Sequence, residues 1–412
     1  MAANDSIKDD VCPGFREFHI DAYLEELHQS GYSKVTLGKK RRVLCAFWRW
    51  ALSKPVSLEH LDESHIAAFA KNSPAAPASC IQFKLSVLRQ YLAYLRAKRV
   101  VRVPLPNAES EVERIHRQYV EYLRQDRGLA ENSVHVYAPF IRGFLDNQKL
   151  GDGRISPSAF DAATLRNHLL TRGMGRSGEY VRLLAISLRS FCRFLFLRGH
   201  TVRDHTHFVP TVKKWRQSTV PAFLTPEQVE RILQATNQST PTGRRDYAVL
   251  LLLARLGLRA AEVVALELCD IRWRCGELVI HGKGQMVEHV PLLSDVGEAL
   301  ARYLHQDRGT STSRQVFLRM WAPHVGLTGP AAIGHIVRLA FARIGLRPSS
   351  RGAAHLFRHG LATTMIRNGA SMAEIAEVLR HRTQDSTAIY AKVSFESLRR
   401  VARAWPTKAD AS

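Results

Sequence analysis

The 412-residue chain carries 59 lysines and arginines against 37 aspartates and glutamates, a formal charge of +22 at pH 7. This length allows two or three domains with separate cores, and this charge predicts an anionic polymer as partner, because basic side chains release counterions from nucleic acid. No apolar run is long enough to cross a bilayer, which argues against a membrane protein and leaves a cytoplasmic one as the expectation.

The six cysteines show neither the pattern of a metal site nor that of a disulfide framework. None of them forms a Cys-x-x-Cys pair, and none is combined with paired histidines at metal-ligand spacing. We therefore expect a reduced protein with no zinc site, and the chemistry considered below requires no metal or other cofactor.

The first half of the chain contains an internal repeat with a period of about 97 to 100 residues. Residues 88–95 (LRQYLAYL) match residues 188–195 (LRSFCRFL). Further matched pairs are Gly31 with Gly128, Thr36 with Ser133, Phe47 with Phe144, and Leu61-Asp62 with Phe160-Asp161. The period is too long for a solenoid unit, so the pattern indicates a duplicated domain. Chance agreement between two amphipathic helices is the alternative.

Both copies have apolar residues at helical spacing, glycine or proline at the breaks, and little alternation of the strand type. Each copy is therefore predicted to be a bundle of about four short helices. We place the first copy at residues 1–105 and the second at residues 106–200.

A basic connector over residues 201–221 follows the second copy. Such a segment is suited to run along a phosphate backbone. The alternative for the connector is a solvated linker, and the alternative for the arginines of the second copy is a solvated helix face. The candidate DNA contacts in the second copy and the connector are Arg182, Arg189, Arg193, Lys213, Lys214 and Arg216.

The C-terminal half opens with a predicted helix start at residues 225–228 (TPEQ), where threonine caps, proline takes the first position and glutamine completes a capping box. A second boundary is predicted near the C-terminus. There Gly369 ends a helix, and Ser371 with Glu374 forms the capping box of the next one.

Three polar residues stand out in the middle of the chain. Arg259 ends the sequence LGLR at residues 256–259, and Glu262 follows one helical turn later. Valine- and isoleucine-rich stretches then flank Lys283, which lies between two glycines. This pattern predicts a β-hairpin with Lys283 at its tip.

Four more polar residues lie near the C-terminus. His355 and Arg358 are three positions apart in a segment of helical pattern, so both side chains project from one face. His381 follows the next predicted helix, and Tyr390 comes nine residues later. Two short helices and a turn can therefore bring the four groups together.

These residue types supply what is needed to cut a phosphodiester without a metal. Guanidinium groups bind non-bridging phosphate oxygens and offset the charge of the transition state. Imidazoles provide hydrogen bonds and proton transfer near neutral pH. The phenolic oxygen of Tyr390 can attack phosphorus and stay bonded to it. Each residue alone has an ordinary structural explanation, but their order and intervals together do not.

In these motifs the chain resembles the tyrosine recombinases, the phage-integrase family that includes the Xer recombinases. The similarity covers about residues 222 to 400 and comprises residues 256–259 with Glu262, residues 279–284 and 290–292, His355 with Arg358, residues 379–381, and Tyr390. One departure is Arg380, where the family usually has a glycine before the histidine. It affects the local turn and not the chemistry.

The resemblance implies a role for each residue. Tyr390 is similar to the family's nucleophile, which forms a 3′-phosphotyrosyl link and frees a 5′-hydroxyl. Arg259 and Arg358 match the two phosphate-binding arginines. Lys283 matches the lysine that protonates the 5′-oxygen leaving group. By the same similarity, His355 assists proton transfer, His381 hydrogen-bonds the phosphate, and Glu262 orients Arg259.

The resemblance also implies a mainly helical fold, with two tandem SAM-like core-binding domains followed by a mixed α/β catalytic domain that is mostly helical and has a small antiparallel sheet. We expect the catalytic domain over residues 222–405 and a disordered tail over 406–412. The second copy resembles the domain that clamps DNA together with the catalytic domain. The first is an extra copy that adds DNA contacts, binds a separate arm site or touches a neighbouring protomer.

The partners implied are duplex DNA with specific recombination sites and further protomers, in a homo-tetramer or a hetero-tetramer with related recombinases. A short basic helix at residues 395–403 is expected to dock on an adjacent protomer or on its own domain. The predicted function is site-specific recombination for the integration, excision or transposition of a mobile element. The alternatives are DNA relaxation of the type IB topoisomerase kind and a non-catalytic DNA-binding regulator.

Overall fold

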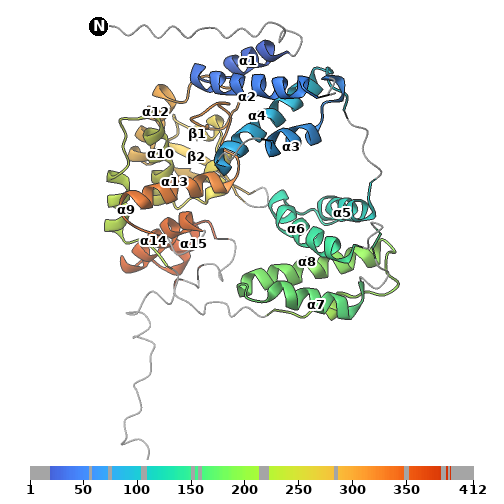
Figure 1. The fold of residues 1–412 in the computed structure, drawn as a ribbon. Helices are drawn as coiled ribbons and strands as arrows, with labels where there is room; N and C mark the ends of the chain where they lie inside the picture. Colours follow the sequence, from blue (N-terminus) through green and yellow to red (C-terminus); the bar gives the residue numbers. More distant parts are fainter. Residues whose placement is uncertain are drawn as a thin grey trace, which may run out of the picture. The chain divides into compact units, whose positions relative to one another are not determined.

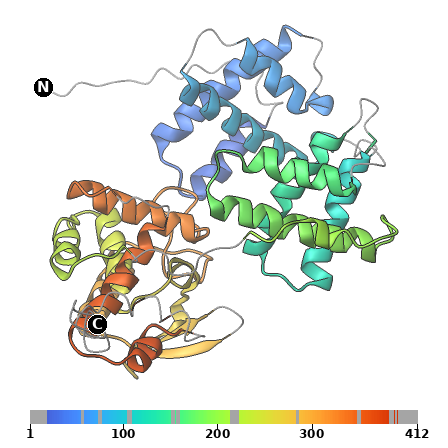
Figure 2. The same ribbon diagram turned by 90° about the horizontal axis from the view of Figure 1, so that it is seen from below.

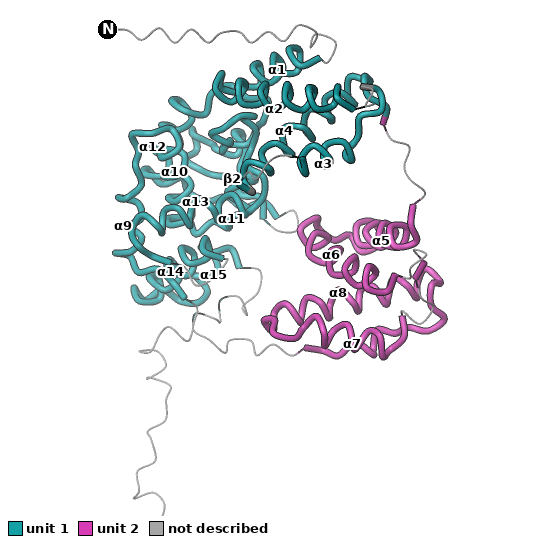
Figure 3. The backbone as a smooth tube through the Cα atoms, viewed as in Figure 1, with its two compact units in different colours: residues 1–102, 219–412 teal, residues 103–218 magenta. Residues whose placement is uncertain are grey.

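The part of the chain that the computed structural model describes is mainly helical and contains one three-stranded antiparallel sheet, which confirms the predicted fold class (Figure 1). The described residues are 19–54, 58–72, 77–103, 109–149, 154–155, 160–212, 222–282, 286–347, 352–381, 387 and 390. By its backbone contacts the chain divides into two compact units, residues 103–218 and residues 1–102 with 219–412 (Figure 3).

The first helical segment, residues 19–103, surrounds one apolar core in which Phe47, Trp48 and Tyr91 are fully buried. The side chains of Ser33 and Asp62 cap two of its helices by accepting hydrogen bonds from backbone amides, a signal that lies within the local sequence. Its helical elements are α1 (Ile20–Gln29), α2 (Lys34–Leu52), η2 (Leu58–His60), α3 (Glu63–Lys71) and α4 (Ala78–Ala97).

The second helical segment, residues 109–212, has a core of aromatic rings in which Phe191 packs edge-on against Tyr119 at 5.2 Å between centroids. A π-helical turn, η3, continues its first helix. Its helical elements are α5 (Glu111–Glu121), η3 (Tyr122–Asp126), α6 (Glu131–Gln148), α7 (Ala162–Gly173), α8 (Gly178–Leu197) and the 3₁₀ turn η5 (Thr206–Phe208).

The residues matched in the internal repeat occupy equivalent places in these two segments. Phe47 and Phe144 are buried on the second helix, Asp62 and Asp161 cap the third, and Gly31 and Gly128 take positive φ values of 89° and 56° before the second. Positive φ disfavours residues with a side chain, so glycine suits this turn in both segments. The two segments thus share the order of their helices, their turn chemistry and the positions of their core residues.

The C-terminal segment, residues 222–381 with Thr387 and Tyr390, contains the sheet. Both predicted capping boxes are formed, at residues 225–228 and 371–374, and Gly369 has a φ of 87° just beyond α14. The elements are α9 (Pro226–Gln234), α10 (Pro241–Arg255), α11 (Ala260–Ala265), η6 (Leu268–Asp270), β1 (Ile271–Arg272), β2 (Glu277–His281), β3 (Val287–Pro291), α12 (Ser294–Gln306), α13 (Pro330–Arg343), α14 (Ala353–Arg367) and α15 (Met372–Val378).

Helix α10 is the centre of this segment. Its residues 248–253 are fully buried, and it packs against α12 and α14, which explains its unbroken apolar sequence. Gly360 on α14 lets that helix approach the chain at Leu224, because a Cβ at this glycine would lie 2.6 Å from the Leu224 carbonyl oxygen. Helix α14 is therefore fixed relative to α10 and to the chain just before α9.

The sheet has the order β1-β2-β3, and Val279 of β2 lies opposite His289 of β3. This pairing confirms the predicted hairpin strands, whereas the tip at residues 283–285 lies outside the described residues. Figure 2 shows the strands at one end of the C-terminal segment, beside its last helices. The basic helix expected at residues 395–403 and the tail 406–412 also lie outside the described part.

Candidate active site

Arg259 is held at the start of α11. Gly257 has a φ of 57°, and a Cβ there would lie 2.9 Å from Cδ2 of Leu379, so glycine allows a tight turn against the end of α15. The Arg259 amide donates to Oε2 of Glu262 over 2.9 Å, and its guanidinium donates to Oε1. Glu262 is buried, so these two bonds fix the direction of the Arg259 side chain.

Arg358 connects α14 to two other parts of the site. It is buried, and its guanidinium donates to the carbonyl oxygen of Gly257 over 2.6 Å and to that of Leu379. Burial, together with the positive charges of Arg259 and Arg380, lowers the pKa of Arg358 to about 10. It therefore stays charged at neutral pH, beside the positive charge of Arg259, which the nearby Glu262 carboxylate partly offsets.

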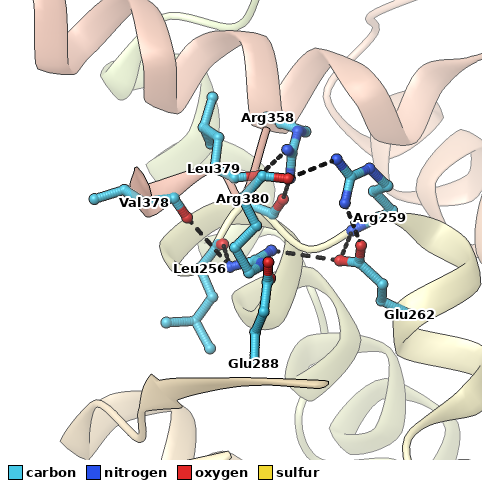
Figure 4. A network of polar contacts seen from close by, with 9 residues as sticks. Leu256, Arg259, Glu262, Glu288, Arg358, Val378, Leu379 and Arg380 are labelled. Carbon is cyan, nitrogen blue, oxygen red and sulfur yellow. Dashed lines mark hydrogen bonds and ion pairs between the residues drawn. The ribbon is translucent and has the colours of Figure 1, made fainter. Parts of the chain in front are cut away.

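The turn after α15 accepts hydrogen bonds from both arginines through its backbone carbonyl groups. The Leu379 carbonyl accepts from Arg358, and the Arg380 carbonyl accepts from Nη2 of Arg259 over 3.2 Å (Figure 4). Arg380 forms this turn with a φ of 54°, in the left-handed region that favours glycine. The chain thus forms this turn with arginine at the position where the family usually has glycine.

Tyr390 is buried and lies beside the turn that follows α15. Its hydroxyl is 2.7 Å from Nδ1 of His359, and its ring lies nearly parallel to that of His381 at 6.1 Å between centroids. Nδ1 of His381 also lies 2.8 Å from the Thr387 hydroxyl oxygen. His355, one turn before His359 on α14, is exposed, and the two rings are 6.4 Å apart.

The electrostatics of the site keep its imidazoles neutral. Burial first, and then the nearby positive charges, lower the pKa values of His359 and His381 to about 4. Burial raises the pKa of Tyr390 to about 12, although Arg358 and Arg259 oppose the rise. At neutral pH the phenol is therefore protonated and faces an imidazole that can accept its hydrogen.

The structure thus brings together six of the seven residues singled out in the C-terminal half: Arg259, Glu262, His355, Arg358, His381 and Tyr390. Lys283 lies outside the described residues. Sequence reasoning missed His359 and the side chain of Arg380. The spacing of His359, four residues after His355 on one helix, is a signal that could have found it.

The arrangement combines two fixed guanidiniums, two neutral imidazoles and a protonated phenol around one turn. Each arginine has five N–H donors, and the bonds described above leave some of them for an anion. The Tyr390 hydroxyl can serve as a nucleophile toward a phosphate bound there, with His359 in contact to take the proton. The site is therefore equipped for nucleophilic attack on a phosphodiester.

The second helical segment has a pocket rich in arginine. Its lining residues are Tyr122, Arg127, Tyr137, Ile186, Arg189, Ser190 and Arg193. The Nε atom of Arg189 is buried without a hydrogen-bond partner among the described residues. Arg182 does not line the pocket and pairs with Glu179 at 2.5 Å.

Two of the three arginines predicted as DNA contacts in this segment thus share one concave basic surface. Lys213, Lys214 and Arg216 lie outside the described residues. In the part of the chain that the structure covers, His, Cys, Asp and Glu form no group of three or more that could hold a metal ion. None of the helices described is both long and apolar enough to span a membrane.

Comparison with protein families gives two matches. Residues 222–397 match the model of the phage integrase family, and residues 20–99 match the model of the phage integrase N-terminal SAM-like domain. The second match falls on the first of the two helical segments.

Individual proteins are similar over most of the chain. The putative integrase/recombinase y4rA of Sinorhizobium fredii is 37% identical over 396 residues, which are 95% of this chain and 95% of that protein. Tyrosine recombinase XerC of Bacillus pumilus is 27% identical over 298 residues, 70% of this chain and 94% of that protein. Among solved structures, XerH site-specific recombinase bound to palindromic difH substrate has a TM-score of 0.56 at 18% identity, covering 73% of this chain and 99% of that one.

The neutral state of the two buried imidazoles gives a testable pH dependence. In NMR titrations of the free protein, the ring signals of His359 and His381 should move with midpoints of about 4, and His359→Gln and His381→Gln variants would assign them. Unfolded histidines bind protons below about pH 6.5, so these residues make the free energy of unfolding rise with pH between 4 and 6.5. Midpoints near the unfolded value would contradict the buried, arginine-flanked arrangement.

Proposed function

The chain belongs to the phage integrase family of tyrosine recombinases, and on this premise we propose that it cuts and rejoins duplex DNA through a covalent 3′-phosphotyrosyl intermediate. The observation that carries the proposal is the hydroxyl of Tyr390, which lies 2.7 Å from the neutral His359, beside the turn that holds Arg259 and Arg358. A nucleophile, a proton acceptor and two phosphate-binding groups thus meet at one place.

Cleavage exchanges one phosphodiester bond for another. The Tyr390 oxygen bonds to phosphorus as the bond between phosphorus and the 5′-oxygen breaks, and the phenolic proton passes to Nδ1 of His359. By similarity to the family, Lys283 gives a proton to the departing 5′-oxygen. Rejoining is the reverse step, in which a 5′-hydroxyl attacks the phosphotyrosine and Tyr390 leaves with a proton. The bond energy is kept throughout, so no nucleotide hydrolysis is needed.

The other site residues act on the phosphate. Arg259 and Arg358 bind its non-bridging oxygens with the N–H groups that the carbonyl contacts leave over. In the tautomer in which Nδ1 of His381 accepts from the Thr387 hydroxyl, Nε2–H is left to donate to the phosphate. His355, exposed one turn away from His359, assists proton transfer.

The DNA backbone is held by the basic pocket of the second helical segment, where Arg127, Arg189 and Arg193 converge. The first segment is a duplicated copy of the same helical unit, and the enzyme acts as a tetramer on two DNA sites. We assign it to the integration or excision of a mobile element, because y4rA, similar along 95% of the chain, is described as a putative integrase/recombinase.

Replacement of Tyr390 by phenylalanine tests the reaction. The substrate is a supercoiled plasmid carrying the DNA that flanks this gene, in buffer with EDTA. The wild-type protein should form an SDS-resistant protein–DNA adduct and exchange strands between sites. Tyr390→Phe should bind the plasmid equally well and form no adduct, whereas Tyr247→Phe, which removes a hydroxyl elsewhere in the segment, should behave as wild type.

Three results would redirect the assignment. An adduct that persists in Tyr390→Phe would remove this residue as the nucleophile. Relaxation of the plasmid without exchange of partners would favour the topoisomerase alternative. Binding of the wild-type protein without any adduct would favour the regulator.

His359→Gln should keep the fold and DNA affinity but slow adduct formation by about a hundredfold, because an amide can hydrogen-bond the Tyr390 hydroxyl but cannot take its proton. Single-turnover adduct formation, measured beside His355→Gln and the distant His305→Gln, separates the roles of the histidines. If His355→Gln slows the reaction and His359→Gln does not, the proton acceptor is His355.

Arg193→Gln should weaken binding of the flanking DNA and reduce the slope of log affinity against log salt by about one, because one phosphate contact is lost. Fluorescence anisotropy at several salt concentrations measures both quantities. The matched control is Arg124→Gln in the same segment, where the arginine pairs with Glu131 instead. Equal effects of the two substitutions would mean that net charge, and not the pocket, sets the affinity.

A further inference from the structure

The side chain of Arg380 is buried in the candidate active site, at a position where the backbone itself favours glycine. Its φ of 54° is one of three positive values found for non-glycine residues in the described part of the chain. A glycine would take this conformation without strain. Arginine at this position therefore has a conformational cost that glycine would not have.

The Arg380 guanidinium contacts four elements of the segment. Nη1 donates to the carbonyl oxygens of Leu256 and Val378, at 3.4 and 3.2 Å. Nη2 donates to Glu262 over 3.3 Å, and Nε lies 3.4 Å from Oε2 of Glu288. These contacts join the end of α10, the end of α15, helix α11 and strand β3 (Figure 4).

Arg380 contacts Arg259 directly through its backbone and indirectly through Glu262. Its carbonyl oxygen accepts from Nη2 of Arg259, and its guanidinium shares the Glu262 carboxylate with Arg259. The side chains of Arg380 and Glu262 are 6% and 4% exposed, so solvent screens these contacts weakly. The direction of Arg259 thus depends on where Arg380 holds Glu262.

The contact with Glu288 extends this arrangement to the sheet. Glu288 lies on β3, and its side chain is partly buried, 31% exposed, against the Arg380 guanidinium. Burial lowers the pKa of Arg380, while Glu262 and Glu288 oppose the shift. One buried arginine therefore balances two carboxylates from different elements, which neither the backbone turn nor a glycine could do.

We propose that Arg380 is a positioning residue, which fixes Arg259 through Glu262 and fixes β3 through Glu288 so that the site is assembled before DNA binds. The inference rests on the proposed cleavage reaction. It differs from a purely electrostatic role, in which Arg380 would only add positive charge for the phosphate. The two roles predict different results for substitutions that alter charge and geometry separately.

The decisive variants are Arg380→Lys and Glu288→Gln. Lysine keeps the charge but has one nitrogen and cannot bridge both carboxylates. Glutamine at 288 makes the site more positive but breaks the ion pair. Under the positioning role, both variants should slow adduct formation on the flanking-DNA plasmid at least fivefold, with DNA affinity within twofold of wild type. The double variant should be no slower than the slower single one, because both remove the same contact.

Hydrogen exchange of the full chain without DNA tests the same contact independently of the reaction. In both variants the β3 amides should exchange faster than in wild type. Arg99→Lys is the matched control, since Arg99 is a second left-handed arginine outside the site with a φ of 60°, and it should change neither the exchange of β3 nor the cleavage rate.

The outcomes separate this inference from the proposed function. Cleavage by Arg380→Lys within twofold of wild type, faster cleavage by Glu288→Gln, or unchanged exchange in β3 would overturn the positioning role while leaving the reaction in place. Absence of any adduct with the wild-type protein would instead count against the proposed reaction, and the exchange of β3 would still report whether Arg380 holds the strand.

Discussion

The carbonyl oxygens of Leu379 and Arg380 are the point on which the candidate site depends. They accept hydrogen bonds from Arg358 and Arg259, two residues 99 positions apart in the sequence. Neither carbonyl belongs to a residue whose side chain takes part in the expected chemistry. The backbone turn therefore determines where the two guanidiniums lie, and it brings His381 into the same place because His381 is the next residue.

The concentration of positive charge around this turn explains the protonation states of its neighbours. Arg259, Arg358 and Arg380 lie close together, and the carboxylates that form ion pairs with this group among the described residues are Glu262 and Glu288. Burial and these charges disfavour imidazolium, so His359 and His381 stay neutral, and His359 can accept the hydrogen of Tyr390. A bound phosphate would add negative charge beside these arginines, close to the proposed nucleophile Tyr390.

The two helical segments illustrate how one helical plan can carry different surfaces. Residues 188–195 contribute Arg189, Ser190 and Arg193 to the basic pocket. At the positions matched to Ser190 and Arg193 the first segment has Gln90 and Ala93. Gln90 accepts a hydrogen bond from the buried Lys40 over 2.6 Å. The matched residues of the two segments thus include core and turn residues, whereas polar residues at two of these positions differ, so the fold of one segment does not predict the binding properties of the other.

The sequence by itself determined the features that depend on neighbours along the chain. The capping boxes at residues 225–228 and 371–374, the helix that carries His355 and Arg358, and the strands of the hairpin follow from local spacing and hydrogen bonding within a few residues. Only the tertiary structure decided that His359 contacts Tyr390, that Arg193 and not Arg182 lines the basic pocket, and that Arg380 reaches both Glu262 and Glu288. The physical reason is that these choices depend on which side chains from distant segments share a buried space, and periodicity along one helix says which face a residue lies on but not what that face meets.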